Sequence, residues 1–153
     1  MNFKGFSYDE IVSKLDEKSI KYITGEKIKD HSIKKIEYMK KYVEQWLYVL
    51  SNVSEKIFFI DVMSNAGIYG NKHLTTSIEV LNIYSKFAQN HPNITFYLLC
   101  NDWDKKRIDN MNHIYSLYEE EFEKYEIKNI KCISSNEEAS IFINNLSKEF
   151  KKV

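Results

Sequence analysis

Hydrophobic residues recur along this chain with two different periods. Five segments repeat them every three or four residues, as amphipathic helices do: 8–23, 31–50, 75–90, 104–124 and the stretch after residue 135. Three shorter segments are mainly apolar, as strands covered on both faces are: IFFIDVM at 57–63, ITFYLLC at 94–100 and NIKCIS at 129–134. The pattern therefore predicts helices that alternate with strands.

The spacing also predicts helix caps and buried helix faces. We expect Asp30 to cap the helix at 31–50, and Ser135 with Glu138 to form the capping box of the last helix. Two faces are expected to point inward: Ile33, Ile36, Met39, Val43, Trp46 and Leu50 in the first of these helices, and Ala139, Phe142, Leu146 and Phe150 in the second.

Alternating helices and strands favour right-handed crossovers and a parallel sheet. The predicted fold is α/β, with a Rossmann-like sheet of three strands alternating with helices. Residues 1–50 form an N-terminal helical segment that packs on the sheet, and residues 51–153 form the Rossmann-like half-domain, together one structural unit. In the strand order 3-2-1, strand 57–63 lies at an apolar edge, and such edges invite association. We therefore expect further sequence, a second polypeptide or a homodimer to complete the sheet.

Composition narrows the functional classes. The 153 residues fit one domain, and 22 basic residues balance 22 acidic ones, so bulk charge does not predict a nucleic-acid clamp. Two charged segments, basic 27–41 and acidic 119–126, are expected as solvated helix faces. The alternative for the basic segment is a nucleic-acid surface formed by Lys34, Lys35, Lys40 and Lys41.

Cysteine usage and the lack of apolar leader sequences point to a cytoplasmic protein. Cys100 and Cys132 lie in strand-like runs without metal-ligand spacing, so we expect buried, reduced thiols and no metal site. The N-terminus has no signal-like apolar region, and no run is long enough to span a membrane, so no membrane association is expected.

The first candidate site follows strand 57–63. Gly67 would let the backbone approach a ligand, and Ser64 and Ala66 are small enough to help. The motif GxGxxG is absent, which argues against a dinucleotide pyrophosphate. Asp61 interrupts an apolar strand and needs a partner, either as a turn cap or as the acceptor for a ligand ammonium group.

The other two strand ends add polar and aromatic candidates. Asp102 is placed to accept hydrogen bonds from two ribose hydroxyls, while Asp104 is expected to cap the next helix. Trp103 is expected either to stack on an adenine or to pack in the core. Asn136 is a candidate for the adenine amino edge.

Two of these stretches resemble a known family. HSIKKIEYMKKYVEQWLYVL (31–50) followed by FFIDVMSNAGIYG (58–70) is similar to the three-Cys-motif partner proteins, regarded as class I S-adenosylmethionine-dependent methyltransferase-like. The resemblance spans about 27–140. It matches a His/Lys-containing helix through His31 and Lys34, a loop after strand 1 through Asp61, Gly67 and Tyr69, and the acid after strand 2 through Asp102.

The resemblance implies half of a class I methyltransferase fold with S-adenosylmethionine as cofactor. It also implies that His31, Lys34 and Tyr69 contact ligand or substrate. The chain would then be the cofactor-binding part of a methyltransferase-like protein of unknown methyl acceptor, and an enzyme if the gene product continues past residue 153. No catalytic base is identified.

Two alternative functions remain open at this point. Residues 63–66 differ from the family's Phe-Ala-Gly-Pro, which favours a non-catalytic interaction subunit on a degenerate methyltransferase fold. Half of a nicotinamide-dependent oxidoreductase is the third hypothesis, and the absent GxGxxG disfavours it.

Overall fold

The computed structural model describes residues 2–16 and 27–151 of the chain. The elements follow one another as α1 (Tyr8–Lys14), α3 (Asp30–Leu50), β1 (Lys56–Asp61), α4 (Thr76–Ala88), β2 (Thr95–Asn101), α5 (Lys105–Lys124), β3 (Ile130–Ser135) and α6 (Ala139–Lys151). The alternation predicted from the sequence is confirmed. The helix expected over 8–23 is shorter than predicted, because α1 ends at Lys14 and Leu15 at its C-cap has an extended backbone. Residues 17–26 of the expected range lie outside the described residues.

The three strands form one parallel sheet in the order β1-β2-β3. Ile57 of β1 lies beside Phe96 of β2, and Phe96 lies beside Ile130 of β3. The predicted strand order is therefore confirmed, and β1 lies at an edge of the sheet. The mixed α/β architecture is consistent with a Rossmann-like fold.

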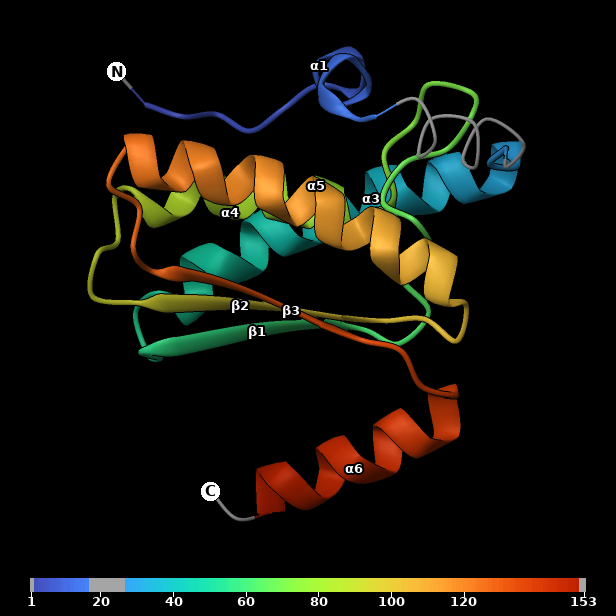
Figure 1. Ribbon diagram of the computed structural model, residues 1–153. Helices are drawn as coiled ribbons and strands as arrows, with labels where there is room; N and C mark the ends of the chain where they lie inside the picture. Colours follow the sequence, from blue (N-terminus) through green and yellow to red (C-terminus); the bar gives the residue numbers. More distant parts are fainter. Residues whose placement is uncertain (1, 17–26, 152–153) are drawn as a thin grey trace.

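Helices cover the two faces of the sheet unequally. Helices α3, α4 and α5 lie on one face, whereas α6 is alone on the other (Figure 1). The covered face holds most of the core, because the apolar stripes of α4 and α5 pack there against alternate strand residues. Fully buried side chains include Ile78, Leu81, Tyr84, Phe96, Leu98, Met111, Ile114 and Tyr118.

The first described residues of the chain also belong to the core. Phe3 and Phe6 are 7% and 5% exposed and pack their rings against Tyr118 of α5. Two side chains hold this segment, one in α4 and one at its C-cap: Asn82 accepts the Phe6 N–H at 3.0 Å, and Gln89 accepts the Phe3 N–H at 3.2 Å. An extended N-terminal strap thus crosses the outer side of α4 and α5.

Two predicted helix caps are wrong. Asp30 is the first residue of α3, and Lys29 occupies the cap position without a side-chain hydrogen bond. Ser135 is the last residue of β3, where its register with Asn101 extends the ladder by one residue, so α6 begins only at Ala139. The predicted cap at Asp104 is confirmed, because its side chain accepts the Lys106 N–H.

The inward faces predicted for α3 and α6 are correct only in part. In α3, Val43 and Leu47 are buried, whereas Met39 is 39% and Trp46 is 51% exposed. In α6, Phe142 is buried, but Phe150 is 43% exposed. The reason is that a single helix on an otherwise open face, or at the end of a layer, has too few neighbours to cover its whole apolar surface.

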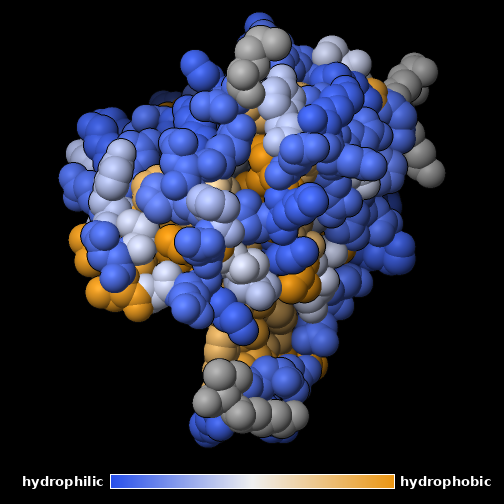
Figure 2. Space-filling view, turned by 90° about the vertical axis from the view of Figure 1, so that its left-hand side faces the viewer, coloured by the Kyte–Doolittle hydropathy of each residue, from blue (hydrophilic) through white to orange (hydrophobic). Residues whose placement is uncertain are grey.

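Helix α3 consequently presents a second apolar surface to solvent. Exposed apolar side chains recur there at three- and four-residue steps and continue into the turn that follows the helix: Tyr38, Tyr42, Trp46, Val49 and Val53. We call this set the α3 stripe. Figure 2 shows further hydrophobic atoms in the narrow waist between the body of the molecule and α6.

No helix within the described residues is both long enough and apolar enough to cross a membrane.

Candidate functional site

The candidate site predicted from the sequence lies at the carboxyl edge of the sheet, where the loops after β1, β2 and β3 meet. Ligands of open α/β sheets bind at this edge. The loop after β1 is joined to the segment that precedes α3, because Asn71 exchanges two side-chain hydrogen bonds with the backbone of Ile28. The first turn of α3, with His31 and Lys34 exposed, therefore begins close to this loop.

Asp61 ends β1 and acts as the cap of the turn that follows. Its Oδ2 accepts the hydroxyl of Ser77 at 2.6 Å, and its Oδ1 accepts the Met63 N–H at 3.3 Å. Burial raises the pKa of the Asp61 carboxyl; the bonds from Ser77 and Met63 oppose this effect, and the nearby charge of Asp102 adds to it. The two acids at adjacent strand ends therefore interact electrostatically, but each is engaged by the protein.

The small residues of the first loop face the core. Ser64, Ala66 and Gly67 are all buried. Gly67 has φ of +96°, and a Cβ built on it would lie 2.6 Å from Cδ1 of Ile114 in α5. The glycine is thus required by a left-handed backbone and by close helix packing, two structural reasons that do not involve a ligand.

Asp102 is the most constrained of the predicted site residues, with 2% of the residue exposed. Its Oδ2 accepts the Asn65 N–H at 2.9 Å, and its Oδ1 accepts the Asp104 N–H at 3.0 Å. The Arg107 guanidinium lies 3.6 Å from Oδ1 and balances the charge. Both carboxylate oxygens are therefore used to hold the loop after β1 against the loop after β2.

Two asparagines complete this connection. Asn101 is fully buried; its Nδ2 donates to the carbonyls of Val62 and Glu137, and its Oδ1 accepts the Glu137 N–H. Asn136 donates to the carbonyls of Asp102 and Trp103, at 2.9 and 3.0 Å. The loops after the three strands are thus joined to one another by side-chain to backbone bonds.

Some candidate residues remain accessible. Trp103 is 70% exposed, which excludes the core-packing interpretation of its indole. Tyr69 is half-buried, and its N–H donates to the carbonyl of His73 across a short bridge between Ile68 and Leu74. The structure therefore brings Asp61, Asp102 and Asn136 together. The carboxylates of Asp61 and Asp102 and the Nδ2 of Asn136 are hydrogen-bonded within the protein, whereas the residues Asn136 and Trp103 are exposed.

Sequence reasoning missed three residues that hold the edge together. Asn101 and Arg107 were overlooked beside Asp102, although a polar residue directly after an apolar strand is a detectable signal. Asn110 of α5 donates to the Ala66 carbonyl at 2.7 Å, and its Oδ1 is buried without a hydrogen-bond partner among the described residues. No periodic pattern marks this asparagine, because its role depends on the approach of a loop 44 residues away.

The two cysteines and the lysines of the basic helix differ in their exposure. Cys100 and Cys132 are both free thiols, the first buried and the second half-buried. Within the described residues, no three His, Cys, Asp or Glu side chains are grouped to hold a metal ion. In the basic helix, Lys40 is paired with Glu79 at 3.1 Å, whereas Lys34, Lys35 and Lys41 are exposed.

The fit of an adenosyl cofactor can be judged from these contacts. Recognition of a ribose by Asp102 needs two free acceptor directions on its carboxylate, and the arrangement described above has none facing solvent. As the loops stand, the edge does not fit that role. Comparisons with known protein families, with curated proteins and with solved structures find no match to this chain, so they add no relative from which a function follows.

Proposed function

We propose that this chain is a non-catalytic interaction module on a Rossmann-like fold, and that it binds another protein surface through the α3 stripe and the free edge of β1. The observation that carries the proposal is the position of the stripe. Tyr42 and Trp46 border a hollow of about 110 Å³ whose other wall is formed by side chains of β1, including Phe58 and Phe59. An apolar helix face and an open strand edge thus form one continuous surface.

The physical reason is that such a surface is unfavourable in water. Large contiguous apolar patches on monomers generally mark interaction sites, and an unpaired strand next to one offers backbone donors and acceptors as well. Trp46 and Tyr42 are 51% and 57% exposed, and aromatic side chains of this kind dominate the binding energy of protein interfaces. The internally bonded carboxyl edge supports the same proposal, since it leaves no free carboxylate at the position expected for ribose recognition.

Site-specific crosslinking tests the proposal, and the chain supplies its own control. A photoreactive phenylalanine analogue replaces Trp46 in one sample and Trp103 in the other; Trp103 is even more solvent-accessible than Trp46 but lies at the carboxyl edge. Irradiation of cells that produce the full chain should give a protein adduct from position 46 and none from position 103. The proposal is overturned by adducts at neither position or by equal adducts at both. Mass spectrometry then identifies the attached protein.

Binding of S-adenosylmethionine is the competing hypothesis, and one observation favours it. Asp61 and Asp102 lie at adjacent strand ends and are near enough for the charge of one to affect the pKa of the other, as two acids that bracket an adenosyl ligand would be. Calorimetry of the folded chain with S-adenosylmethionine and with S-adenosylhomocysteine separates the two hypotheses. Saturable heat that Asp102→Asn abolishes would favour the cofactor; no heat from either ligand would favour the interaction module.

A further inference from the structure

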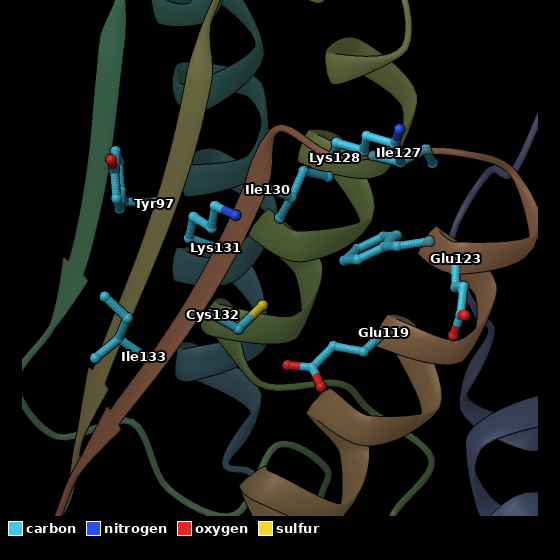
Figure 3. A pocket seen from close by; sticks show the side chains of 10 residues that line it. Tyr97, Glu119, Glu123, Ile127, Lys128, Ile130, Lys131, Cys132 and Ile133 are labelled. Carbon is cyan, nitrogen blue, oxygen red and sulfur yellow. The ribbon is translucent and has the colours of Figure 1, made fainter.

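The sheet has two edges, and they differ in how they are protected. Beside β3 lies an open hollow of about 640 Å³ whose rim carries charges of both signs: Glu119, Glu123, Lys128 and Lys131 (Figure 3). Charged side chains at an edge oppose the approach of another strand, because pairing would remove them from water. The charged side chains at the β3 edge therefore disfavour pairing with another strand.

The β1 edge lacks this protection. Its sequence, KIFFID, carries one lysine at the start and its only acid at the end, where Ser77 and the Met63 N–H already engage the carboxylate. The strand contains no proline and no glycine. Above it lie the exposed rings of Tyr42 and Trp46 rather than charges. Of the two edges, β1 is the one that favours pairing.

The ladder with β2 determines which backbone groups of β1 are free. Thr95 donates its N–H to the carbonyl of Glu55, and in a parallel pair alternate residues bond to the same neighbour. Odd-numbered residues of β1 therefore face β2. The N–H and carbonyl groups of the even-numbered residues, Lys56, Phe58 and Ile60, point away from the sheet.

We infer that a second copy of this chain occupies the β1 edge, with the two β1 strands antiparallel about a two-fold axis at Phe58, so that the two sheets join into one of six strands. This inference rests on the proposed interaction function and names its partner. The register centred on Phe58 sets Phe58 opposite its symmetry mate and Lys56 opposite Ile60, so all three residues with free backbone groups pair. A two-fold axis through one residue of a strand always pairs that strand with its own copy in an antiparallel register that is symmetric about that residue.

The position of the Phe58 side chain is also consistent with a two-fold axis at this residue. Phe58 points to the α6 side of the sheet, where its ring stacks on Tyr97 at 4.5 Å between centroids and meets Phe150 edge-on at 5.4 Å. It nevertheless remains 38% exposed. The symmetry mate of Phe58 would cover the uncovered part of the ring, and aromatic cross-strand pairs are favourable.

The α3 stripe is also complementary to itself. Trp46 stands at its centre, with Tyr38 and Tyr42 before it and Val49 and Val53 after it. When two such stripes cross antiparallel at Trp46, each tyrosine meets a valine of the other copy, so large side chains pack on small ones. Trp46 and Phe58 line the same hollow, so one two-fold axis brings both the helices and the strands together.

The surface is large enough for a stable dimer. Aromatic side chains bury roughly 150–250 Å² each when fully covered, so three aromatic residues at half to three-quarters exposure supply several hundred Å² per copy. The two valines, Met39 and the strand edge add to this. Standard interfaces bury about 800 Å² per partner, which is the range that this face provides.

The first test is the molar mass of the full chain, measured by light scattering and sedimentation over a dilution series. We expect a dimer that dissociates on dilution. Trp46→Lys should raise its dissociation constant more than about tenfold, because a charge would be buried at the centre of the interface. Trp103→Lys is the matched control and should leave the dissociation constant unchanged. A monomer at every concentration, or equal effects of the two variants, would overturn the inference.

The second test fixes the register. Residues opposite each other in a hydrogen-bonded antiparallel pair have Cα atoms about 5.5 Å apart, within the roughly 4.4–6.8 Å that a disulfide spans. Phe58→Cys should therefore give a disulfide-linked dimer on mild oxidation, whereas Lys131→Cys, exposed on the opposite edge, should not. Circular dichroism confirms folding of both variants. Equal crosslinking through both positions, or none through position 58, contradicts the two-fold pairing.

These outcomes separate the inference from the proposed function on which it rests. If the chain is monomeric but position 46 crosslinks to a different protein, the second copy is wrong and the interaction module stands. If position 46 gives no adduct and the chain is monomeric, both are wrong.

Discussion

Gly67 offers the clearest measure of whether the loop after β1 is built for packing or for a ligand. Its φ of +96° lies in a region that side-chain-bearing residues rarely adopt, and a methyl group there would lie 2.6 Å from Cδ1 of Ile114 and 3.4 Å from Ile78 and Met111. Backbone strain costs about 1–3 kcal/mol and overpacking a core a similar amount, and rotation of Ile114 relieves part of the second. Gly67→Ala should therefore destabilise the fold by about 2–4 kcal/mol.

Urea denaturation measures this loss, with Gly70→Ala as the matched control. Gly70 lies in the same loop but does not have a positive φ, so its substitution should change the free energy of unfolding by less than about 0.5 kcal/mol. The clash itself is isolated by a double-mutant cycle with Ile114→Val, which removes the Cδ1 methyl. We expect the double variant to be about 1 kcal/mol more stable than additivity requires.

The reasoning fails if Gly67→Ala is as stable as the parent, or if its effect adds to that of Ile114→Val without coupling. In the first case the loop would have room for a side chain, so packing would not explain why a glycine occupies position 67. Close approach of a ligand would then again be the better explanation.

Three further predictions concern buried acids and thiols. Asp102→Ala should destabilise the fold by about 2–4 kcal/mol in denaturant titrations, since it removes charged acceptors of the Asn65 and Asp104 N–H groups; a variant as stable as the parent would refute this. Because burial raises the pKa of Asp61 in the folded protein, ionisation of this carboxyl opposes folding. The contribution of Asp61 to the free energy of unfolding therefore falls as the pH rises from the pKa of the unfolded state through that of the folded state. Asp61→Asn should accordingly gain stability relative to the parent at neutral pH, and the gain should shrink in acid; a gain that grows in acid would contradict the sign. Burial also raises the pKa of the Cys100 thiol to about 12, so in the Cys132→Ser variant, whose one remaining cysteine is Cys100, a disulfide reagent at pH 8 should react only after unfolding; rapid reaction of this variant in its native state would refute the burial of Cys100.

The element order could be predicted from the sequence, and the choice of buried helix face only in part. Alternating periods identify helices and strands because each period reflects local geometry. Helix α3, however, is apolar on more than one side, and periodicity does not say which side meets the sheet. The structure turns Val43 and Leu47 inward and leaves Trp46 outside. That choice depends on neighbours distant in sequence.

At the candidate site, the type of residue at a strand end could be predicted from the sequence, but the contacts of that residue could not. The sequence predicts an acid directly after the second strand, and Asp102 lies at that strand end. Its role differs, since its oxygens are bonded to the loop of another strand. Whether a polar atom is free for a ligand depends on where the N–H of Asn65, 37 residues away, comes to lie. No local pattern carries that information.

The N-terminal strap has a consequence for the order in which the chain acquires its structure during synthesis. Phe6 is held by Asn82, 76 residues further along, and Phe3 is held by Gln89, 86 residues further along. The ribosome adds about 5–20 residues each second, so these two phenylalanines emerge several seconds before their partners exist. During that interval their rings have no core to enter. The strap is thus synthesised first but can pack only after its partners have been synthesised. In a nascent chain arrested before α5, proteases should therefore cleave the strap, whereas they should not cleave it in the folded protein.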